Sequence, residues 1–325
     1  MGTGAVGVRA TRHLAGVGSV VTVVSRDPRR STMVAASVGG SAAEWTTPVT
    51  EPEDLADVVA RRGGPSPTVV IATAGSHLSW ARAALAGGAD VVSTASDPAD
   101  CSSLTDLDTE ARSRSRTVVV GAGMAPGFAC LLAAWVASRS DEVGAVRVTT
   151  HGSGGPACAD AARGELRGRT HEYRHGWTTK PAGRSRRLVW FPAPIGVQRS
   201  AAAASSLPML LAPVVHAGII EASRTVPLRR LHRSSEETLG GLVVEVEGRS
   251  ESGATTTVLG TVDRPAAIAG AVAAAVAWNL ARADAEGVEV RWPLGAHGVA
   301  AGSDPGALLA ALARRGVRAA EFIGA

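Results

Sequence analysis

The chain has 325 residues, of which 45% are hydrophobic and 19% charged, a composition typical of a folded protein rather than a disordered one. Its formal net charge of +4 is small for this length, and it carries no helix-turn-helix, zinc-finger or aromatic RNA-binding pattern, so we expect no nucleic-acid partner. Its three cysteines are too widely spaced for a disulfide framework or a zinc site, which favours a reducing, cytoplasmic location and predicts no metal.

The chain opens with Gly2, Gly4 and Gly7 in the spacing G-x-G-x-x-G, followed by a helical pattern that ends near Gly16. In a dinucleotide-binding fold the first glycine permits a tight turn, the second lets a pyrophosphate approach, and the third lets the helix pack on the strand. Only Met1 precedes the motif here. We therefore expect the first strand to be missing from the sheet and the glycines to be held from the helix side only. The alternative is a Gly-rich N-terminal tail.

Strands and helices alternate from residue 19 to about residue 125. The expected strands are 19–24, 68–75, 90–95 and 117–123, and the expected helices are 52–63, 77–88 and 106–115. The strands are near-continuous β-branched runs, which indicates a parallel sheet covered on both faces. We predict an α/β fold built on a Rossmann-type doubly wound parallel sheet.

The residues after the strand 19–24 discriminate between cofactors. An acidic side chain at this point binds the adenosine ribose of NAD, whereas Arg accommodates the 2′-phosphate of NADP. Ser25 and Arg26 stand here, followed by Asp27, Arg29 and Arg30. We predict NADP, with NAD as the less favoured alternative.

After a predicted helix at 125–138 the pattern changes to strands and loops. Residues 243–262 predict an antiparallel hairpin with its turn near Ser252 and Gly253, and a helix follows over 264–283. The tail predicts a last helix capped at Ser303 or Asp304. The apolar runs 207–220 and 266–281 are shorter than the roughly 20 residues of a membrane span, so we expect no span.

Several segments together resemble the saccharopine dehydrogenase-like superfamily: GTGAVG (2–7), VVIATAG (69–75), GADVVSTASD (88–97), GAGMAPGFACLLA (121–133) and DPGALLAALARRGV (304–317). The resemblance implies a dinucleotide-binding domain at 1–140 that is completed by 284–325. It also implies an inserted α+β substrate and dimerisation domain at 141–283, and hence a homo-oligomer. The implied activity is NAD(P)-dependent oxidoreduction of a small amino- or keto-acid-like metabolite.

The resemblance also implies a set of cofactor-binding residues. Carried over by position, they are Gly2, Gly4, Ala5, Val6 and Gly7 at the pyrophosphate, Ser25 and Arg26 at the ribose, Thr73, Ala74, Gly75 and Thr94 along the cofactor, and Gly121 to Gly127 on the nicotinamide side. Many members carry an Asp after the strand at 90–95, where this chain has Val91 to Thr94.

Hydride transfer to or from a bound cofactor also needs a group that moves a proton. His151, beside a Gly-rich stretch in the substrate segment, is the predicted catalytic residue; the alternative is a packing role. Two other functions stay open: a non-catalytic dinucleotide-binding or sensing homologue, and a carbonyl or enoyl reductase for an apolar substrate, which the run 207–220 suggests.

Overall fold

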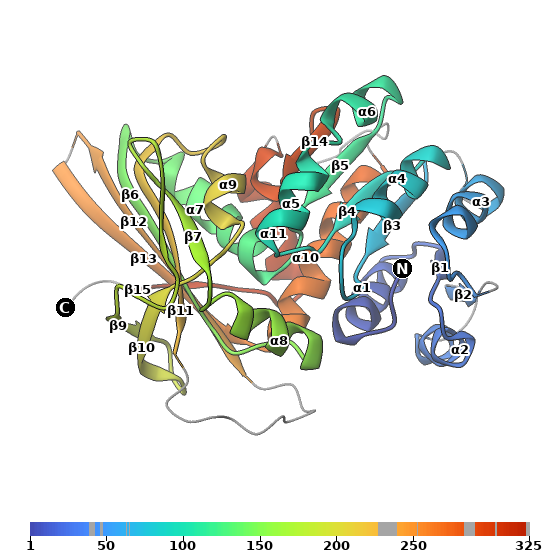
Figure 1. The fold of residues 1–325 in the computed structure, drawn as a ribbon, viewed down its shortest axis with the longest axis horizontal. Helices are drawn as coiled ribbons and strands as arrows, with labels where there is room; N and C mark the ends of the chain where they lie inside the picture. Colours follow the sequence, from blue (N-terminus) through green and yellow to red (C-terminus); the bar gives the residue numbers. More distant parts are fainter. Residues whose placement is uncertain are drawn as a thin grey trace.

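The computed structural model describes residues 1–38, 43–45, 48–62, 64, 66–226, 239–251, 253–282, 290–302 and 304–322. The described strands form three β-sheets: two parallel sheets of four and two strands toward the N-terminus, which continue one another, and a larger mixed sheet beside them, with helices between (Figure 1). The predicted α/β class with a Rossmann-type parallel sheet is confirmed.

The parallel sheet has the strand order of a dinucleotide-binding fold and is interrupted in its middle. On one side β3 (Thr68–Ile71), β4 (Asp90–Ser93), β5 (Thr117–Val120) and β14 (Gly295–Gly298) pair in that order, all in parallel. On the other side β1 (Val21–Val23) pairs in parallel with β2 (Ala43–Trp45).

Met1 and Gly2 lie in this interruption. The Met1 carbonyl accepts a hydrogen bond from the Ala72 amide at 2.9 Å, and the Gly2 amide donates to the Val24 carbonyl at 2.9 Å. The expectation that the glycines are held from the helix side only is therefore wrong. The backbone before the fingerprint is bonded to the chain that follows β3 and to the chain that follows β1.

Helices cover both faces of the parallel sheet. They are α1 (Ala5–Gly16), α2 (Pro28–Ser37), α3 (Pro52–Arg62), α4 (Leu78–Ala86), α5 (Pro98–Thr105), α6 (Asp108–Ser113) and α10 (Pro265–Leu280). Val91 packs in one apolar cluster with Leu55 and Leu104, whereas the next residue, Val92, packs in another with Val272 of α10. Because successive strand side chains point to opposite faces, burial on both faces explains the continuous apolar runs.

An irregular helical turn, η2 (Met124–Phe128), and α7 (Ala129–Ala137) lead to the larger sheet. Its strands run in the order β15 (Ala320–Phe322), β13 (Gly253–Asp263), β12 (Gly240–Ser250), β6 (Glu142–His151), β11 (Ala217–Thr225), β10 (Gly196–Ala202) and β9 (Arg187–Phe191), while β7 (Arg169–Arg174) pairs with β11 and β8 (Trp177–Pro181) pairs with β7. β6 and β11 are parallel to each other. β12 and β13 form the predicted hairpin, whose Ser252 lies outside the described residues.

One apolar core joins the two sheets. It contains Val119 of β5, Val146 of β6 and Leu242 of β12, together with residues of α7, α10 and α11 (Pro305–Arg314). The predicted cap of the last helix is Asp304, whose carboxylate accepts from the Ala307 amide at 3.0 Å; Ser303 lies outside the described residues. The remaining short elements are α8 (Pro156–Gly164), α9 (Leu207–Leu211) and η3 (Val299–Ala301).

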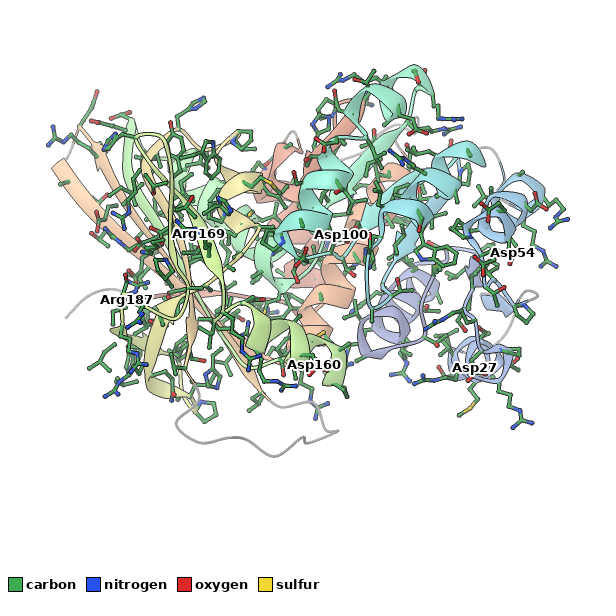
Figure 2. All side chains as sticks on the ribbon, viewed as in Figure 1. Asp27, Asp54, Asp100, Asp160, Arg169 and Arg187 are labelled. Atoms are coloured by element: carbon green, nitrogen blue, oxygen red, sulfur yellow. The ribbon has the colours of Figure 1, made fainter. Side chains whose placement is uncertain are left out.

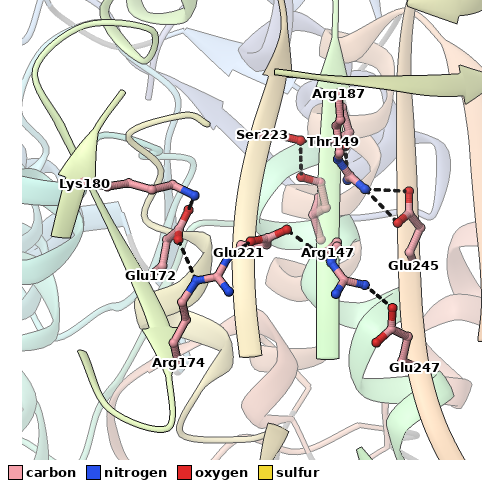
Figure 3. Close-up of polar contacts among 11 residues, drawn as sticks. Arg147, Thr149, Glu172, Arg174, Lys180, Arg187, Glu221, Ser223, Glu245 and Glu247 are labelled. Carbon is pink, nitrogen blue, oxygen red and sulfur yellow. Dashed lines mark hydrogen bonds and ion pairs between the residues drawn. The ribbon is translucent and has the colours of Figure 1, made fainter. Parts of the chain in front are cut away.

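The face of the larger sheet turned away from these helices is polar (Figure 3). Arg147 on β6 lies 3.2 Å from a carboxylate oxygen of Glu221 and also pairs with Glu247. Arg187 pairs with Glu245 at 2.9 Å. These two cations are balanced by carboxylates of neighbouring strands.

Candidate functional site

The three fingerprint glycines have three different surroundings. Gly2 has a φ of +103°, and a Cβ there would collide with the Ala72 carbonyl. A Cβ on Gly7, in α1, would collide with the Gly2 carbonyl. At Gly4 a Cβ would meet no atom within 4 Å. Gly2 and Gly7 are thus required by close backbone approach, whereas Gly4 leaves open space.

That open space lies at the N-terminus of α1. Gly4 is the N-cap residue, no side chain caps the helix, and its first turn, which includes Ala5 and Val6, has no acidic residue. The free N–H groups and the dipole of such a helix end favour an anion. The residues present therefore fit the pyrophosphate of a dinucleotide, in the arrangement that the fingerprint predicts.

The residues after β1 include one acidic and several basic side chains. The Asp27 carboxylate accepts from the Arg29 and Arg30 amides at 3.0 and 3.4 Å and so caps α2, beside which Figure 2 labels it. The Ser25 hydroxyl donates to the Asp27 carbonyl at 2.8 Å, and Arg26 is exposed. The acidic residue that would suit NAD is engaged in capping, while the basic side chain faces solvent.

The loops after β3 and β4 adjoin the fingerprint. The Thr94 amide and hydroxyl both donate to the Ile71 carbonyl at 3.1 Å. Ala74 and Gly75 are exposed, and Gly75 has a φ of +88°. The Thr73 hydroxyl is buried and has no hydrogen-bond partner within the part of the chain that the structure describes.

His77, at the end of the loop after β3, was not predicted as a site residue. Its side chain is buried, with Nδ1 2.8 Å from the Ser93 hydroxyl and Nε2 3.0 Å from the Thr73 carbonyl oxygen. Burial lowers the pKa of His77 from its ordinary value of 6.5, against the opposing effects of the Thr73 carbonyl and of Asp100. In the sequence, His77 only begins a helical pattern, so no local signal distinguishes it.

The turn after β5 packs against these loops. Gly121 has a φ of +78°, and a Cβ there would lie 2.6 Å from the Pro126 ring. A Cβ on Gly127 would lie 2.6 Å from the Gly121 carbonyl oxygen. The Ala122 amide donates to the Ser93 carbonyl at 2.7 Å. The structure thus gathers the predicted residues of the fingerprint and of these strand ends at one edge of the parallel sheet.

His151 ends β6 in the other sheet. Its Nδ1 lies 3.0 Å from the Thr225 hydroxyl, and its ring centroid lies 5.8 Å from that of Phe191. The pKa of His151 is lowered from its ordinary value of 6.5, mainly by burial and to a smaller extent by the charge of Arg224. A neutral imidazole at this position can accept a proton.

A group that the sequence did not reveal holds the residues on either side of His151. Arg224 on β11 donates to Glu165 at 3.1 Å, to the Thr150 hydroxyl at 3.3 Å and to the Gly152 carbonyl. The parallel pairing of β6 with β11 places Arg224 opposite Thr150. This long-range pairing, which no spacing in the sequence records, brings a guanidinium beside the predicted catalytic histidine.

Helix α10 connects this group to the fingerprint. A Cβ on Gly154, three residues after His151, would lie 3.1 Å from the Ala266 amide in the first turn of α10. One turn further, a Cβ on Gly270 would lie 3.1 Å from the Val6 carbonyl oxygen of α1. The loop after β6 and the start of α1 therefore pack against the same end of α10.

Four further observations concern other parts of the described residues. No group of three or more His, Cys, Asp or Glu side chains is placed to hold a metal there, and none of the helices described is long and apolar enough to cross a bilayer. A hollow of about 690 Å³ lies at the opposite end of β6 and β11, lined among others by Glu142, Tyr173 and His216, and contains none of the predicted site residues. Leu207 and Leu211 are fully buried, so this part of the run 207–220 offers no apolar substrate surface.

No protein-family model matches the sequence, and no curated protein matches it. Among solved structures, the chain is similar to GenD2 from gentamicin A biosynthesis in complex with NAD, with 16% identity over 99% of this chain and 95% of that one and a TM-score of 0.48. It is similar to the DAP dehydrogenase of C. glutamicum in complex with DAP, with 13% identity over 89% and 94% and a TM-score of 0.46. It is also similar to a putative myo-inositol dehydrogenase from Sinorhizobium meliloti, with 13% identity over 97% and 93% and a TM-score of 0.47.

None of these three structures is described as a saccharopine dehydrogenase. TM-scores below 0.5 mark a distant likeness. The fold is therefore assigned from the strand order of the parallel sheet, and function is argued from the site itself.

Proposed function

We propose that the protein is an NADP-preferring oxidoreductase that acts on a small amino- or keto-acid-like metabolite. The observation that carries the proposal is the contrast among the fingerprint glycines: Gly2 and Gly7 are closed by backbone contacts, while Gly4 opens onto the N-terminus of α1. A Gly-rich tail would not be expected to have close backbone contacts at Gly2 and Gly7 together with open space at Gly4. The narrower saccharopine dehydrogenase-like assignment is supported by the sequence segments that resemble that family.

The preference for NADP is supported by the end of β1. Arg26 is exposed there, and the Asp27 carboxylate is occupied by the amides of α2. A guanidinium binds a phosphate through two parallel, charge-assisted hydrogen bonds. Ser25 and Arg26 would therefore hold the 2′-phosphate, and Gly4 to Gly7 the pyrophosphate.

The substrate class is supported by the group around His151. A bound nicotinamide supplies the hydride chemistry. In the oxidative direction neutral His151 accepts the proton that the substrate amino or hydroxyl group loses, and in the reductive direction its protonated form returns it. Arg224, whose charge Glu165 balances, holds the Gly152 carbonyl next to His151. Both residues lie on the loop and strand ends that α10 ties to α1.

We further propose the division of labour that the resemblance implies: residues 1–140 with 284–325 for the cofactor, and 141–283 for substrate binding and dimerisation. Exposed apolar side chains on the neighbouring strands β9 and β10 support a homo-oligomer, namely Leu188, Trp190 and Val197, which are 70%, 55% and 58% exposed. Light scattering on the purified chain tests this, since a monomeric mass would contradict it.

A cytoplasmic location is supported by three cysteines that form no disulfide, and cell fractionation tests it.

Titration of the full-length protein with NADPH and NADH, followed by the fluorescence of its seven tryptophans, tests the cofactor proposal. A screen of amino and keto acids for substrate-dependent change in nicotinamide absorbance then tests catalysis. Saturable binding with turnover is the expected result. Binding without turnover of any substrate would favour the non-catalytic homologue, and no binding of either dinucleotide would overturn the proposal.

A further inference from the structure

We propose that His77 is a positioning residue for the dinucleotide: by holding the Thr73 carbonyl, it fixes the loop that lines the predicted cofactor site. The proposal rests on the proposed function and adds to it a residue that neither the fingerprint nor the resemblance indicates. His77 would not touch the cofactor. It would act through the backbone of Thr73.

The hydrogen bonds of His77 define its protonation. A carbonyl oxygen can only accept, so the 3.0 Å contact with Thr73 requires a proton on Nε2. The neutral imidazole then accepts the Ser93 hydroxyl proton at Nδ1, over 2.8 Å. Ser93 in turn accepts from the Ala95 amide at 3.2 Å. This assignment follows from the partners, and burial, which lowers the pKa of His77, favours the same neutral form.

The result is a chain of hydrogen bonds between two cofactor loops. It runs from the Ala95 amide through Ser93 and His77 to the Thr73 carbonyl, and so connects the end of β4 with the end of β3. Ser93 is 0% exposed and His77 is 2% exposed. In such a dry environment hydrogen bonds are strong, and an unpaired donor is costly.

The backbone at His77 is held from the opposite direction. The Asp100 carboxylate on α5, labelled in Figure 2, accepts from the His77 amide at 3.0 Å and from the Ser76 hydroxyl at 2.7 Å. The imidazole is therefore anchored at its own backbone before it reaches back to Thr73. His77 therefore connects α5, through its amide, to the start of the loop, through its side chain.

The loop itself has few other constraints. Ala74, Gly75 and Ser76 are exposed, and Gly75 adopts a positive φ. The Thr73 hydroxyl has no partner among the described residues although it is buried. The bond from His77 to the Thr73 carbonyl thus fixes the segment at the point where it leaves β3, directly beside the Ala72 amide that bonds to Met1. A loop fixed before binding loses less entropy when a ligand binds.

Two conservative substitutions separate this role from simple packing. In His77→Gln the side-chain amide can reach the position of Nε2 and still donate to Thr73. In His77→Asn the shorter amide reaches only the position of Nδ1, near Ser93, and leaves the Thr73 carbonyl without its donor. Both variants remove the ring, so they share any loss of packing. They differ in the bond that is kept: Gln keeps the bond to the Thr73 carbonyl, and Asn keeps the bond to the Ser93 hydroxyl.

The test is to measure NADPH affinity by tryptophan fluorescence, and the unliganded thermal midpoint, for the wild type and both variants. We expect His77→Asn to bind NADPH about tenfold more weakly, which corresponds to the loss of one positioning hydrogen bond, and His77→Gln to stay within about threefold of the wild type. Equal affinity of the two variants, whatever their midpoints, would overturn the role of His77 while leaving the proposed function intact. A wild type that binds neither NADPH nor NADH would overturn both.

Discussion

The guanidinium of Arg224 lies 3.1 Å from a carboxylate oxygen of Glu165, and the two side chains are only 12% and 21% exposed. Burial raises the pKa of Glu165 above its ordinary value of 4.5, and Arg224 is the group that opposes this rise. Arg224 therefore favours the charged form of a buried carboxylate. The pair also holds Arg224 at the end of β11, beside His151.

Arg224→Met should make stability depend on pH through Glu165. Without the guanidinium, the folded-state pKa of Glu165 rises further above its unfolded value, so the free energy of unfolding falls as pH rises through that folded pKa. We expect a loss of about 1–3 kcal/mol relative to the wild type at neutral pH and a smaller loss in acid. Urea unfolding at several pH values measures it. Adding Glu165→Gln should abolish the extra pH dependence, and its persistence in the double variant would contradict this account.

Arg26→Ala should change the choice of cofactor rather than the fold. Because Arg26 is exposed, its removal should leave the thermal midpoint unchanged. NADPH affinity should fall about tenfold or more while NADH affinity is almost unaffected, since one charge-assisted contact to the phosphate is lost. Arg61→Ala is the matched control, because Arg61 is an exposed arginine of α3 that pairs with Asp57. An equal loss for both dinucleotides would argue against the 2′-phosphate contact.

His151 should produce a pH profile with a midpoint below 6.5. Burial and Arg224 lower the pKa of His151, so its neutral, proton-accepting form predominates at neutral pH. The rate of oxidation should therefore rise with pH through that lowered pKa and then level off. His151→Asn should reduce kcat by about 10²–10⁴, whereas the exposed His171→Asn should not. An unchanged rate and profile in His151→Asn would assign the proton to another group.

The cysteines should differ sharply in reactivity. Burial raises the pKa of Cys101 to about 12 and raises that of Cys130 as well, whereas Cys158, in α8, is exposed. Because the thiolate is the reactive form, brief treatment of the native protein with a maleimide should label Cys158 alone. Mass spectrometry of the peptides checks this, with urea-unfolded protein as the control in which all three react. Early labelling of Cys101 would contradict its buried position in α5.

Local patterns were sufficient to predict β1, β3, β4 and β5 of the parallel sheet, but not β2 or β14. Strands buried on both faces leave near-continuous β-branched runs. Gly7 is required by a contact with nearby Gly2, whereas Gly2 is required by the distant Ala72 carbonyl. The boundaries were less accurate. The strand expected at 68–75 ends at Ile71, because the small residues of the following turn read like strand. The helix expected at 125–138 becomes regular only at Ala129, after the irregular turn η2.

Long-range contacts could not be predicted in the same way. His77 meets Ser93 across 16 positions, and Arg224 meets Glu165 across 59. Locally, His77 only begins a helix and Arg224 only lies near the end of a strand. The contacts that they make depend on which distant segments the fold places next to them. A single sequence records side-chain periodicity but not that pairing.

The central claim is that Gly4 leaves room for a dinucleotide, and Gly4→Ala tests it most directly. The φ of −79° at Gly4 suits alanine, and a Cβ there meets no protein atom within 4 Å, so stability should fall only by the difference between Gly and Ala at an N-cap, about 1 kcal/mol. The added methyl group would occupy the proposed pyrophosphate space. Titration with NADPH should therefore show saturable binding for the wild type and for Gly16→Ala, a control that also has open space, and at least about tenfold weaker binding for Gly4→Ala. Equal NADPH affinity in wild type and Gly4→Ala, or no binding by the wild type, would contradict the account.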